Sequence, residues 1–414
     1  MQQRGDTAAI VPTTPNVWRA FATIGLVVAI TQIGFFLTSA ALPLYLRDLG
    51  APEGRIGLEV GSGNLAALFV MLALGPALNR RGPRPFITLG AALYLVAALA
   101  MIALPAEGPV TLFRVLQGIG TAVIMPSAST LATGLLPNRP ATAIGLMSSL
   151  NSLALAAGPP IGLALYAAGG ATGLFLPAAC AAALGFAATW LLPRARPTHR
   201  ARGFGFDRAW IPLFVANALG IIHFGGILAY LSLDLRARHG PNAGIFFAAD
   251  SVGVLLLRAP TGMFVDRAGS RWPKLIGIAF ILPGILFLGL SPTPLTLIAA
   301  GAGTGIGAGL LVSGIMADLA RLSTGANRGT ALALGSASFS GAFFVGSTFS
   351  GLLYTAGGFG AIVRFGAIMA VAALPFALLS GARGASGGSR PGDVGDDRGS
   401  TPVADAPVHG PHGA

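Results

Sequence analysis

Seven ionisable side chains lie inside long apolar stretches of the chain: Glu59, Arg114, His223, Asp250, Arg258, Asp318 and Arg364. A charge in such surroundings is costly, so each of them is a functional candidate by default. Asp250 suits proton transfer, because Ala, Phe and Val surround it and burial favours the neutral form of an acid. An ion pair with Arg258, two helical turns away, is the structural alternative.

Spacing and residue type add two further candidates. Arg114 and Gln117 are three residues apart and therefore share one face of a helix. An arginine in a membrane span usually faces a cavity. This one lies roughly 8 Å from the predicted helix end, so snorkelling to the membrane surface is the alternative. His223 is the one histidine inside an apolar stretch and titrates near neutral pH. A proton relay and a hydrogen-bonded packing role are both open for it.

Uncharged residues complete the candidates for a substrate cavity. The first apolar stretch has no carboxylate, and its polar and aromatic residues include Gln32 and Phe36. We predict that they line a cavity together with Gln117, Asn151 and Tyr230. A neutral, aromatic-rich cavity suits an uncharged or amphipathic solute better than a strongly cationic one.

Two of the acids are predicted to lie at the surface. Glu59 lies near the start of its apolar stretch, so we predict it at the outer surface beside Arg55. Asp318 ends another stretch three residues before Arg321, a spacing that favours a surface ion pair.

The elements that must position these residues are membrane spans. Hydrophobic residues make up 54% of the 414-residue chain and charged residues only 10%. Soluble domains carry about 25% charged residues, so the composition excludes a soluble protein. A span needs about 20 mostly apolar residues. We therefore predict an all-α integral membrane protein with twelve spans, at residues 18–43, 56–79, 86–104, 109–135, 142–167, 172–192, 210–235, 243–265, 274–291, 294–318, 328–355 and 359–380.

The charges in the loops predict the orientation. Nineteen of the 26 basic residues lie in segments on the side of the N-terminus, four lie in loops on the other side, and three lie within spans. Basic loops stay in the cytoplasm, so we predict both termini there, in a multi-pass protein of the inner cell membrane. The formal net charge of +12 thus comes from short loops and gives no support to nucleic-acid binding.

An internal repeat divides the chain. The pattern G-x-x-x-(D/N)-R-x-G-x-R occurs after the second span and, 187 residues later, after the eighth. Its members are Gly75, Asn79, Arg80, Gly82 and Arg84, and then Gly262, Asp266, Arg267, Gly269 and Arg271. Two six-helix halves follow, at 18–192 and 210–380, with a basic cytoplasmic linker at 193–209; residues 1–17 and 381–414 are predicted to be disordered. Parallel repeats of this kind are typical of secondary transporters.

The repeated loop resembles the signature of the major facilitator superfamily, and the resemblance extends over residues 18–380. In that family the loop holds the cytoplasmic side shut. Asn79 stands where the family has an Asp, which implies a weaker gate in the first half, whereas Asp266 retains the charge in the second copy.

Two further motifs point to a subgroup of that family. The stretch from Arg114 to Gly120 is similar to a motif of proton-coupled members. Gly158, Pro159 and Gly162 resemble the centre of a drug:proton antiporter motif, although two outer glycines of that motif are replaced. The resemblance implies a bend and close packing between the two halves at this helix.

The leading hypothesis is a secondary active transporter that works by alternating access and exports a small organic molecule in exchange for protons. An uptake permease or an uncoupled facilitator is the alternative, because the exporter motif is incomplete and carboxylates inside the spans are few. A non-transporting receptor or scaffold is a remote alternative. The sequence shows no catalytic constellation, nucleotide loop or metal-ligand spacing, so we expect no enzyme activity, no cofactor and no metal. The expected partners are the substrate, the proton and the lipid bilayer, with no nucleic acid and with the protein as a monomer.

Overall fold

The structure, a computed structural model, describes residues 14–104, 107–136, 140–193, 206–323 and 328–382, and these residues form helices and no strands. Two short 3-10 helices, η1 (Thr189–Leu191) and η2 (Arg208–Trp210), flank the middle of the chain. The α-helices of the described residues are α1 (Thr14–Asp48), α2 (Glu53–Arg81), α3 (Arg84–Ala103), α4 (Glu107–Leu135), α5 (Pro140–Ala188), α6 (Ile211–Ala237), α7 (Gly244–Ala268), α8 (Arg271–Phe287), α9 (Pro294–Leu322) and α10 (Arg328–Ala382).

Two of the helices are too long to be single membrane spans. α5 has 49 residues and α10 has 55. At 1.5 Å per residue a straight helix of either length would exceed roughly 70 Å, while the hydrocarbon core is about 30 Å thick. Each is broken at a glycine with positive φ, Gly170 at 57° and Gly358 at 63°, a conformation that glycine adopts without a steric penalty. Counting both segments of α5 and α10, the described helices supply twelve segments that correspond to the twelve predicted spans.

The apolar character of the helices fits a membrane environment. Among the described residues, eight helices are long and apolar enough to cross a membrane, and the apolar stretches of α5 with η1 and of α10 cover 46 and 50 residues. The other two described α-helices, α7 and α8, are shorter in their apolar parts. α8 has 17 residues in all, and the apolar part of α7 covers Gly244–Leu257. Large apolar side chains lie exposed on the outer faces of the helices, as contact with lipid allows: Leu184, Leu256 and Leu295 are each more than 60% exposed.

The helix ends differ from the predicted boundaries at both termini. Residues 14–17 belong to α1 and residues 381–382 belong to α10, so the predicted disorder was wrong for them. A helix that is already formed in the membrane propagates at little cost beyond its apolar part. The remainder of both predicted disordered segments, and most of the predicted linker at 193–209, lies outside the described residues.

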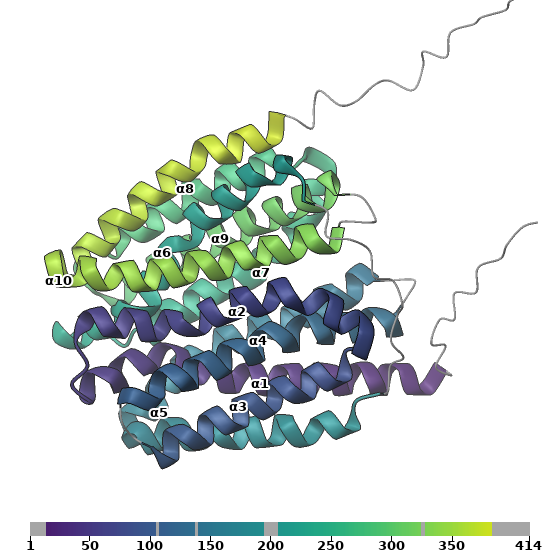
Figure 1. The fold of residues 1–414 in the computed structure, drawn as a ribbon. Helices are drawn as coiled ribbons and strands as arrows, with labels where there is room; N and C mark the ends of the chain where they lie inside the picture. Colours follow the sequence, from purple (N-terminus) through teal and green to yellow (C-terminus); the bar gives the residue numbers. More distant parts are fainter. Residues whose placement is uncertain (1–13, 105–106, 137–139, 194–205, 324–327, 383–414) are drawn as a thin grey trace, which may run out of the picture.

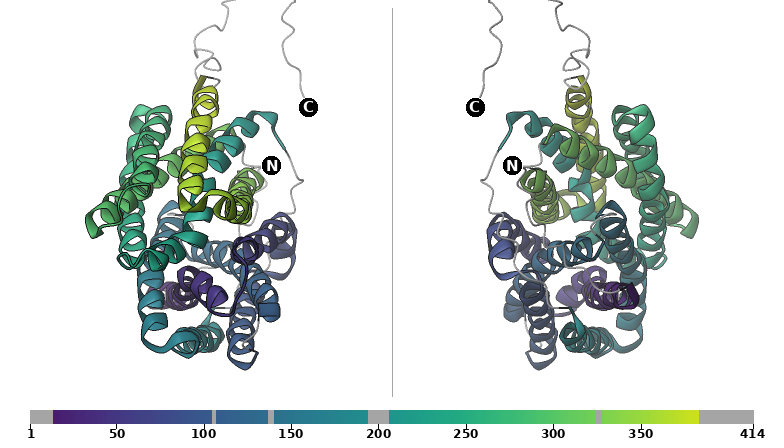
Figure 2. Two further views of the ribbon diagram at one scale, coloured as in Figure 1. Left: turned by 90° about the vertical axis from the view of Figure 1, so that its left-hand side faces the viewer. Right: turned by 90° about the vertical axis from the view of Figure 1, so that its right-hand side faces the viewer.

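The helices run roughly parallel to one another in two groups (Figure 1). α1 to α5 form one group, in which α1 packs on α5 and α4 packs on both α2 and α3. α6 to α10 form the other, in which α6 packs on α10 and α9 packs on both α7 and α8. The groups meet where α2 lies against the first segment of α10 and where α5 lies against α7. Figure 2 shows the same two groups from both ends.

Glycines bring helix backbones into direct contact inside each group. A Cβ atom at Gly118 of α4 would lie 1.8 Å from the carbonyl oxygen of Gly63 on α2. A Cβ atom at Gly305 of α9 would lie 1.9 Å from the carbonyl oxygen of Asp250 on α7. Small residues at such contacts are how helices associate in a bilayer, where van der Waals packing replaces the hydrophobic effect. These contacts fix the spacing of α2 from α4 and of α7 from α9.

The glycine motif in α5 packs differently from the expectation. Gly158 and Gly162 face α1 in the same half, and a Cβ atom at Gly162 would lie 1.9 Å from the Leu37 carbonyl oxygen. Pro160 lies against Gly244 of α7, in the other half. The expectation of close packing between the halves was therefore wrong for the two glycines, because they lie on the side of α5 that faces α1.

Candidate functional site

Asp250 is buried in the second group of helices, with 3% of its surface exposed. Its Oδ1 accepts a hydrogen bond of 2.7 Å from the hydroxyl of Thr304 on α9. The backbone contact at Gly305 holds α7 and α9 together at this level, so the carboxyl stays against α9. None of the ion pairs between described side chains includes Asp250, and the side chain of Arg258 lies outside the described ones. An ionised carboxyl is costly without a cation in such surroundings.

Arg114 is buried in the first group, with 1% of its surface exposed, so it does not snorkel to the membrane surface. Nη1 donates to Oε1 of Gln117 at 3.0 Å, and Nη2 donates to the carbonyl oxygen of Val60 on α2 at 3.0 Å. The guanidinium carbon lies 5.5 Å from the ring centroid of Phe35, a cation–π contact. Nε has no hydrogen-bond partner among the described residues. Arg114 and Gln117 therefore act as one polar unit on a shared helix face.

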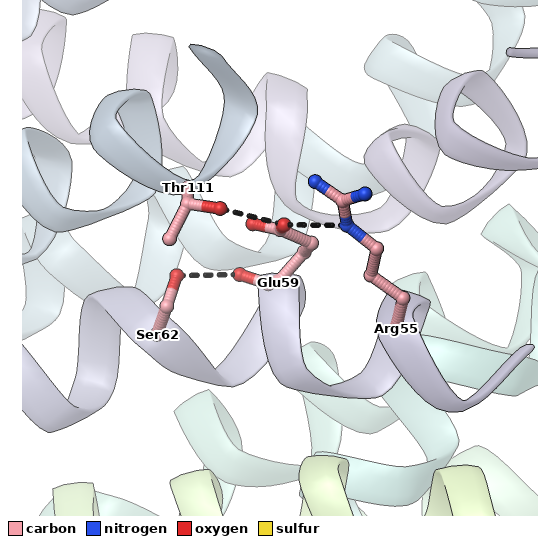
Figure 3. Close-up of polar contacts among 4 residues, drawn as sticks. All are labelled: Arg55, Glu59, Ser62 and Thr111. Atoms are coloured by element: carbon pink, nitrogen blue, oxygen red, sulfur yellow. Dashed lines mark hydrogen bonds and ion pairs between the residues drawn. The ribbon is translucent and has the colours of Figure 1, made fainter. Parts of the chain in front are cut away.

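Glu59 occupies a different environment from the predicted one. Only 1% of its surface is exposed, and Figure 3 shows its carboxyl directed at α4. Oε1 accepts a hydrogen bond of 2.6 Å from Thr111 of α4 and one of 3.3 Å from Nε of Arg55. The Ser62 hydroxyl donates to the Glu59 backbone carbonyl at 2.8 Å. The predicted neighbour Arg55 is confirmed, but the predicted exposure was wrong, because α4 covers this face of α2.

An uncharged network joins four helices of the first group. Nε2 of Gln32 on α1 donates to Oδ1 of Asn151 on α5 at 2.5 Å. The hydroxyl of Tyr94 on α3 donates to Oε1 of Gln32 at 3.3 Å and bonds to the hydroxyl of Thr121 on α4. Gln117 extends the polar region by donating to the Thr38 hydroxyl at 3.3 Å.

A small cavity lies beside this network, with room for about one water molecule. Its lining comes from α1, α3, α4 and α5 and includes Phe35, Tyr94 and Gln117. Phe35 stacks on Tyr94 with ring centroids 5.9 Å apart and meets Phe36 edge-on at 5.1 Å. The structure thus gathers four of the five predicted cavity residues in one region: Gln32, Phe36, Gln117 and Asn151.

His223 and Tyr230 lie elsewhere, although both are buried on α6. His223 packs against Gly366 in the second segment of α10, and its Nδ1 has no hydrogen-bond partner among the described residues. The hydroxyl of Tyr230 donates to the Glu53 carbonyl at 2.5 Å, and its ring stacks on Tyr354 with centroids 4.9 Å apart. Tyr230 therefore joins the two halves near the start of α2.

The halves are held together at the end of the molecule where α1 leads into α2, on the left in Figure 1. Arg236 of α6 forms an ion pair of 3.0 Å with Asp48 of α1, and Tyr166 donates to the same carboxylate at 2.5 Å. The Ser232 hydroxyl of α6 donates to the Ala40 carbonyl of α1 at 3.2 Å. α1 begins and α10 ends toward the opposite end of the molecule. Together with the Tyr230 bond, these contacts close the end that contains Asp48.

The two copies of the repeated loop form the same turn. Gly82 ends α2 with φ of 74°, and Gly269 ends α7 with φ of 80°. Each donates its backbone N–H to the residue four positions earlier. Arg84 donates to the Trp190 carbonyl at 3.1 Å, and Arg271 is exposed. The other motif positions lie outside the side chains that the structure describes, so the predicted gate stays a prediction for Gly75, Asn79, Arg80, Gly262, Asp266 and Arg267.

Sequence reasoning missed a buried ion pair between α8 and α9. Nζ of Lys274, fully buried, lies 2.6 Å from Oδ2 of Asp318, whose side chain is 10% exposed. Arg321 donates to the Val265 carbonyl at 2.8 Å. The predicted surface pair was wrong, because Asp318 points into the bundle and meets a cation from the neighbouring helix. A lysine near the start of an apolar helix was the signal for this pair, and Tyr94 in an apolar helix was the corresponding signal for the uncharged network.

The residues that the structure describes offer no group of three His, Cys, Asp or Glu side chains that could hold a metal ion. The buried polar groups described above are instead single carboxyls, a lysine–aspartate pair, an arginine, a histidine and hydrogen-bonded amides and hydroxyls. Such groups can bind protons and uncharged polar groups of a solute.

A family model described as Major Facilitator Superfamily matches the chain twice, at residues 24–235 and 211–405. An uncharacterized MFS-type transporter of Burkholderia mallei (strain SAVP1) is 30% identical over 125 residues, which are 30% of this chain and 30% of that protein. A probable vesicular acetylcholine transporter-B of Danio rerio is 28% identical over 152 residues, 35% of this chain and 31% of that protein. The matched segment thus spans less than a third of the length of each curated relative.

Solved structures with little sequence similarity share the fold. The nucleoside transporter NupG aligns with a TM-score of 0.73 and 14% identity, over 88% of this chain and 99% of that one. A bacterial homologue of the human lysosomal transporter Spinster, in an inward-facing and occupied conformation, aligns with a TM-score of 0.68 and 16% identity, over 90% and 96% of the two chains. At these identities the likeness concerns the arrangement of the helices alone.

Proposed function

Since the chain belongs to the major facilitator superfamily, we propose that it is a secondary active transporter that exports a small organic molecule in exchange for protons. Its two halves rock about a central site and expose that site to each side of the membrane in turn. No catalytic role is assigned to any residue in this proposal.

Asp250 carries the proton-coupling part of the proposal. It is 3% exposed, and its carboxyl accepts a hydrogen bond from Thr304 on a neighbouring helix. A carboxyl in this position can alternate between the neutral and the charged form as the site opens to either side. Arg114 and His223 are the other buried groups with proton chemistry, and we place them behind Asp250 because Arg114 keeps its charge and His223 packs on α10.

The substrate in this proposal is an uncharged or amphipathic aromatic molecule. The polar groups around Gln32 and Asn151 are amides and hydroxyls, which recognise neutral hydrogen-bonding groups. Phe35 and Phe36 lie beside them and offer ring faces and edges. The small cavity next to these residues lies inside the first half, between α1, α3, α4 and α5.

We further propose the arrangement in the cell. Both termini lie in the cytoplasm of a protein of the inner cell membrane, which functions as a monomer. Residues 18–192 and 210–380 are the two moving halves, and 193–209 is the linker between them. The end that Asp48 and Arg236 hold together would then face the outside, and the present conformation would be closed to the outside.

The test is transport into inverted membrane vesicles with an acid interior. A panel of uncharged aromatic compounds, with radiolabelled chloramphenicol as the first, is supplied outside. We expect at least one compound to accumulate and the vesicle interior to become more alkaline at the same time. Vesicles without the protein, and vesicles treated with a protonophore, are the controls.

Two outcomes would overturn the proposal. Compound entry that continues unchanged after the pH gradient is collapsed would indicate an uncoupled facilitator. Transport driven in the opposite direction, out of inverted vesicles, would indicate an uptake permease.

A further inference from the structure

Two buried charged groups in the first half lack complete partners: Glu59 on α2 and Arg114 on the neighbouring helix α4. Oε2 of Glu59 and Nε of Arg114 have no hydrogen-bond partner among the described residues. Arg114 reaches α2 at the carbonyl of Val60, the residue that follows Glu59. The carboxylate also attracts the guanidinium electrostatically. An anion and a cation that are each incompletely satisfied therefore lie within reach of one another.

The backbones that carry these groups cannot move apart or slide easily. A Cβ atom at Gly63 would lie 2.6 Å from the carbonyl oxygen of Arg114, and one at Gly118, a turn after Arg114, would lie 1.8 Å from the carbonyl oxygen of Gly63. Close packing of this kind prevents α2 and α4 from shifting relative to one another. A change in the pairing of Glu59 and Arg114 is therefore a change of side-chain conformation.

The other partners of Glu59 leave its charge poorly compensated. The Thr111 hydroxyl is neutral, and the Arg55 side chain is 39% exposed. A solvated arginine at 3.3 Å compensates a buried carboxylate only in part. The same Arg55 links the carboxyl to the surface, since its Nε lies 3.3 Å from Glu59 Oε1 and 39% of its side chain is exposed.

The remaining neighbours of Glu59 bring no competing charge. α6 presents Tyr230, whose hydroxyl is bonded to the Glu53 carbonyl. α10 presents Ser347 and Phe344 to this part of α2, and neither is ionisable. The state of Glu59 thus depends on Arg55, on Arg114 and on a proton.

We propose that Glu59 is a second proton-binding site of this transporter and that its carboxyl exchanges a proton for the guanidinium of Arg114. In the neutral state the carboxyl keeps its hydrogen bond from Thr111. On ionisation the O–H bond breaks, the proton passes to a water molecule at the Arg55 side, and the electron pair stays on the carboxylate. Nε–H of Arg114 then donates to the freed oxygen. This inference rests on the proposed function, because it assigns a second proton to the same transport cycle.

We assign a direction to this coupling. In the present conformation, closed at the Asp48 end, Arg114 bonds to Gln117 and to the Val60 carbonyl rather than to the Glu59 carboxyl. Ionisation favours a conformation in which the pair is formed, which we assign to the one that is open at the Asp48 end. Higher pH should therefore open that end.

The test measures opening at Ser232, which is 4% exposed between α6 and α1. The full-length protein carries Ser232→Cys and Cys180→Ser, because Cys180 is exposed, and it is reconstituted in liposomes. The rate of labelling by a membrane-impermeant maleimide is followed from mildly acid to mildly alkaline pH. The pH effect on the thiol itself is removed by reference to the labelling rate of a small free thiol in solution.

We expect the corrected labelling rate to rise severalfold between the acid and the alkaline end of this pH range. In Glu59→Gln the rate should stay at its low, acid value throughout. Arg114→Gln should give the same flat profile and serves as a second variant if Glu59→Gln does not fold. Ser62→Ala is the matched control, since Ser62 donates to the backbone carbonyl of Glu59 and not to its carboxyl, and it should keep the full pH response.

Three results would overturn the inference: a pH response of normal size in Glu59→Gln, an equal loss of the response in Ser62→Ala, or no pH response in the reference protein. The labelling needs no substrate, so its outcome is separate from that of the vesicle assay. A failure of gradient-driven transport with a Glu59-dependent labelling profile would refute the exchange of substrate for protons and leave the proton site in place.

Discussion

Removing one partner of the buried pair between Lys274 and Asp318 should strongly destabilise the second half. Lys274 is fully buried, and the Asp318 carboxylate lies 2.6 Å from its Nζ. Lys274→Met keeps most of the aliphatic stem, which packs beside Gly314, but leaves a buried carboxylate without this cation. Breaking a buried pair in this way costs about 3–5 kcal/mol in the free energy of unfolding. In a membrane the unfolded helices find other polar partners, so we expect a value near the lower bound, about 3 kcal/mol.

The double variant Lys274→Met, Asp318→Leu removes both charges. It therefore distinguishes the destabilisation caused by an unpaired buried carboxylate from the net contribution of the ion pair to the free energy of unfolding. Replacement of both partners by apolar groups is often close to neutral, so the double variant should lie within about 1 kcal/mol of the wild type. The free energies of unfolding are measured by titration with sodium dodecyl sulfate in mixed micelles, followed by circular dichroism, after refolding has been shown to be reversible.

A control pair tests whether burial is the cause. Arg47 and Glu53 are 2.5 Å apart, but their side chains are 52% and 30% exposed. Arg47→Gln should therefore cost less than about 1 kcal/mol. The reasoning is refuted if Lys274→Met costs no more than Arg47→Gln, or if the double variant is as unstable as the single one.

Three other predictions concern packing, coupling and topology. Gly118→Ala should destabilise the protein by about 1–3 kcal/mol, because the added methyl group overpacks the contact with α2. Gly134→Ala is the control in the same helix and should be tolerated, because open space surrounds Gly134. The two variants are compared by thermal unfolding in detergent. Asp250→Asn should abolish gradient-driven transport but spare substrate exchange between the two sides, because exchange needs no net proton movement. Undiminished gradient-driven transport in Asp250→Asn would remove this residue from the coupling mechanism. Reporter fusions after Arg84 and Arg202 should both report the cytoplasm, and an external signal after Arg202 would overturn the two-half topology.

Much of the helical architecture could be predicted from the sequence, because the bilayer imposes a fixed length on every span. Breaks near 170 and 357 were expected between long apolar stretches, and the chain breaks there at Gly170 and Gly358. The equivalent turns at Gly82 and Gly269 follow from a repeated glycine whose φ must be positive. These features are local, so residue type and spacing suffice to indicate them.

The partners of the buried polar residues could be predicted only in part. Arg114 and Gln117 were paired by their spacing on one helix, and this contact is present. Gln32 and Asn151 were both named as cavity candidates, but their mutual hydrogen bond joins residues on two helices far apart in the sequence. Contacts between helices depend on rotation and crossing angle, which periodicity does not give when all faces of a helix are apolar.

The sequence by itself determined that the chain is an all-helical membrane protein, since too few charged residues are present to cover a soluble surface. It also placed Arg114, His223 and Asp250 within spans. The tertiary structure decided which of those groups are neutralised. Lys274, one cation among many in the predicted loops, became the buried partner of Asp318. Glu59, predicted at the surface, became a buried acid beside Arg114, because α4 packs over the side of α2 from which its carboxyl projects. The cost of a charge in a membrane is set by its nearest neighbours, and those neighbours come from other helices.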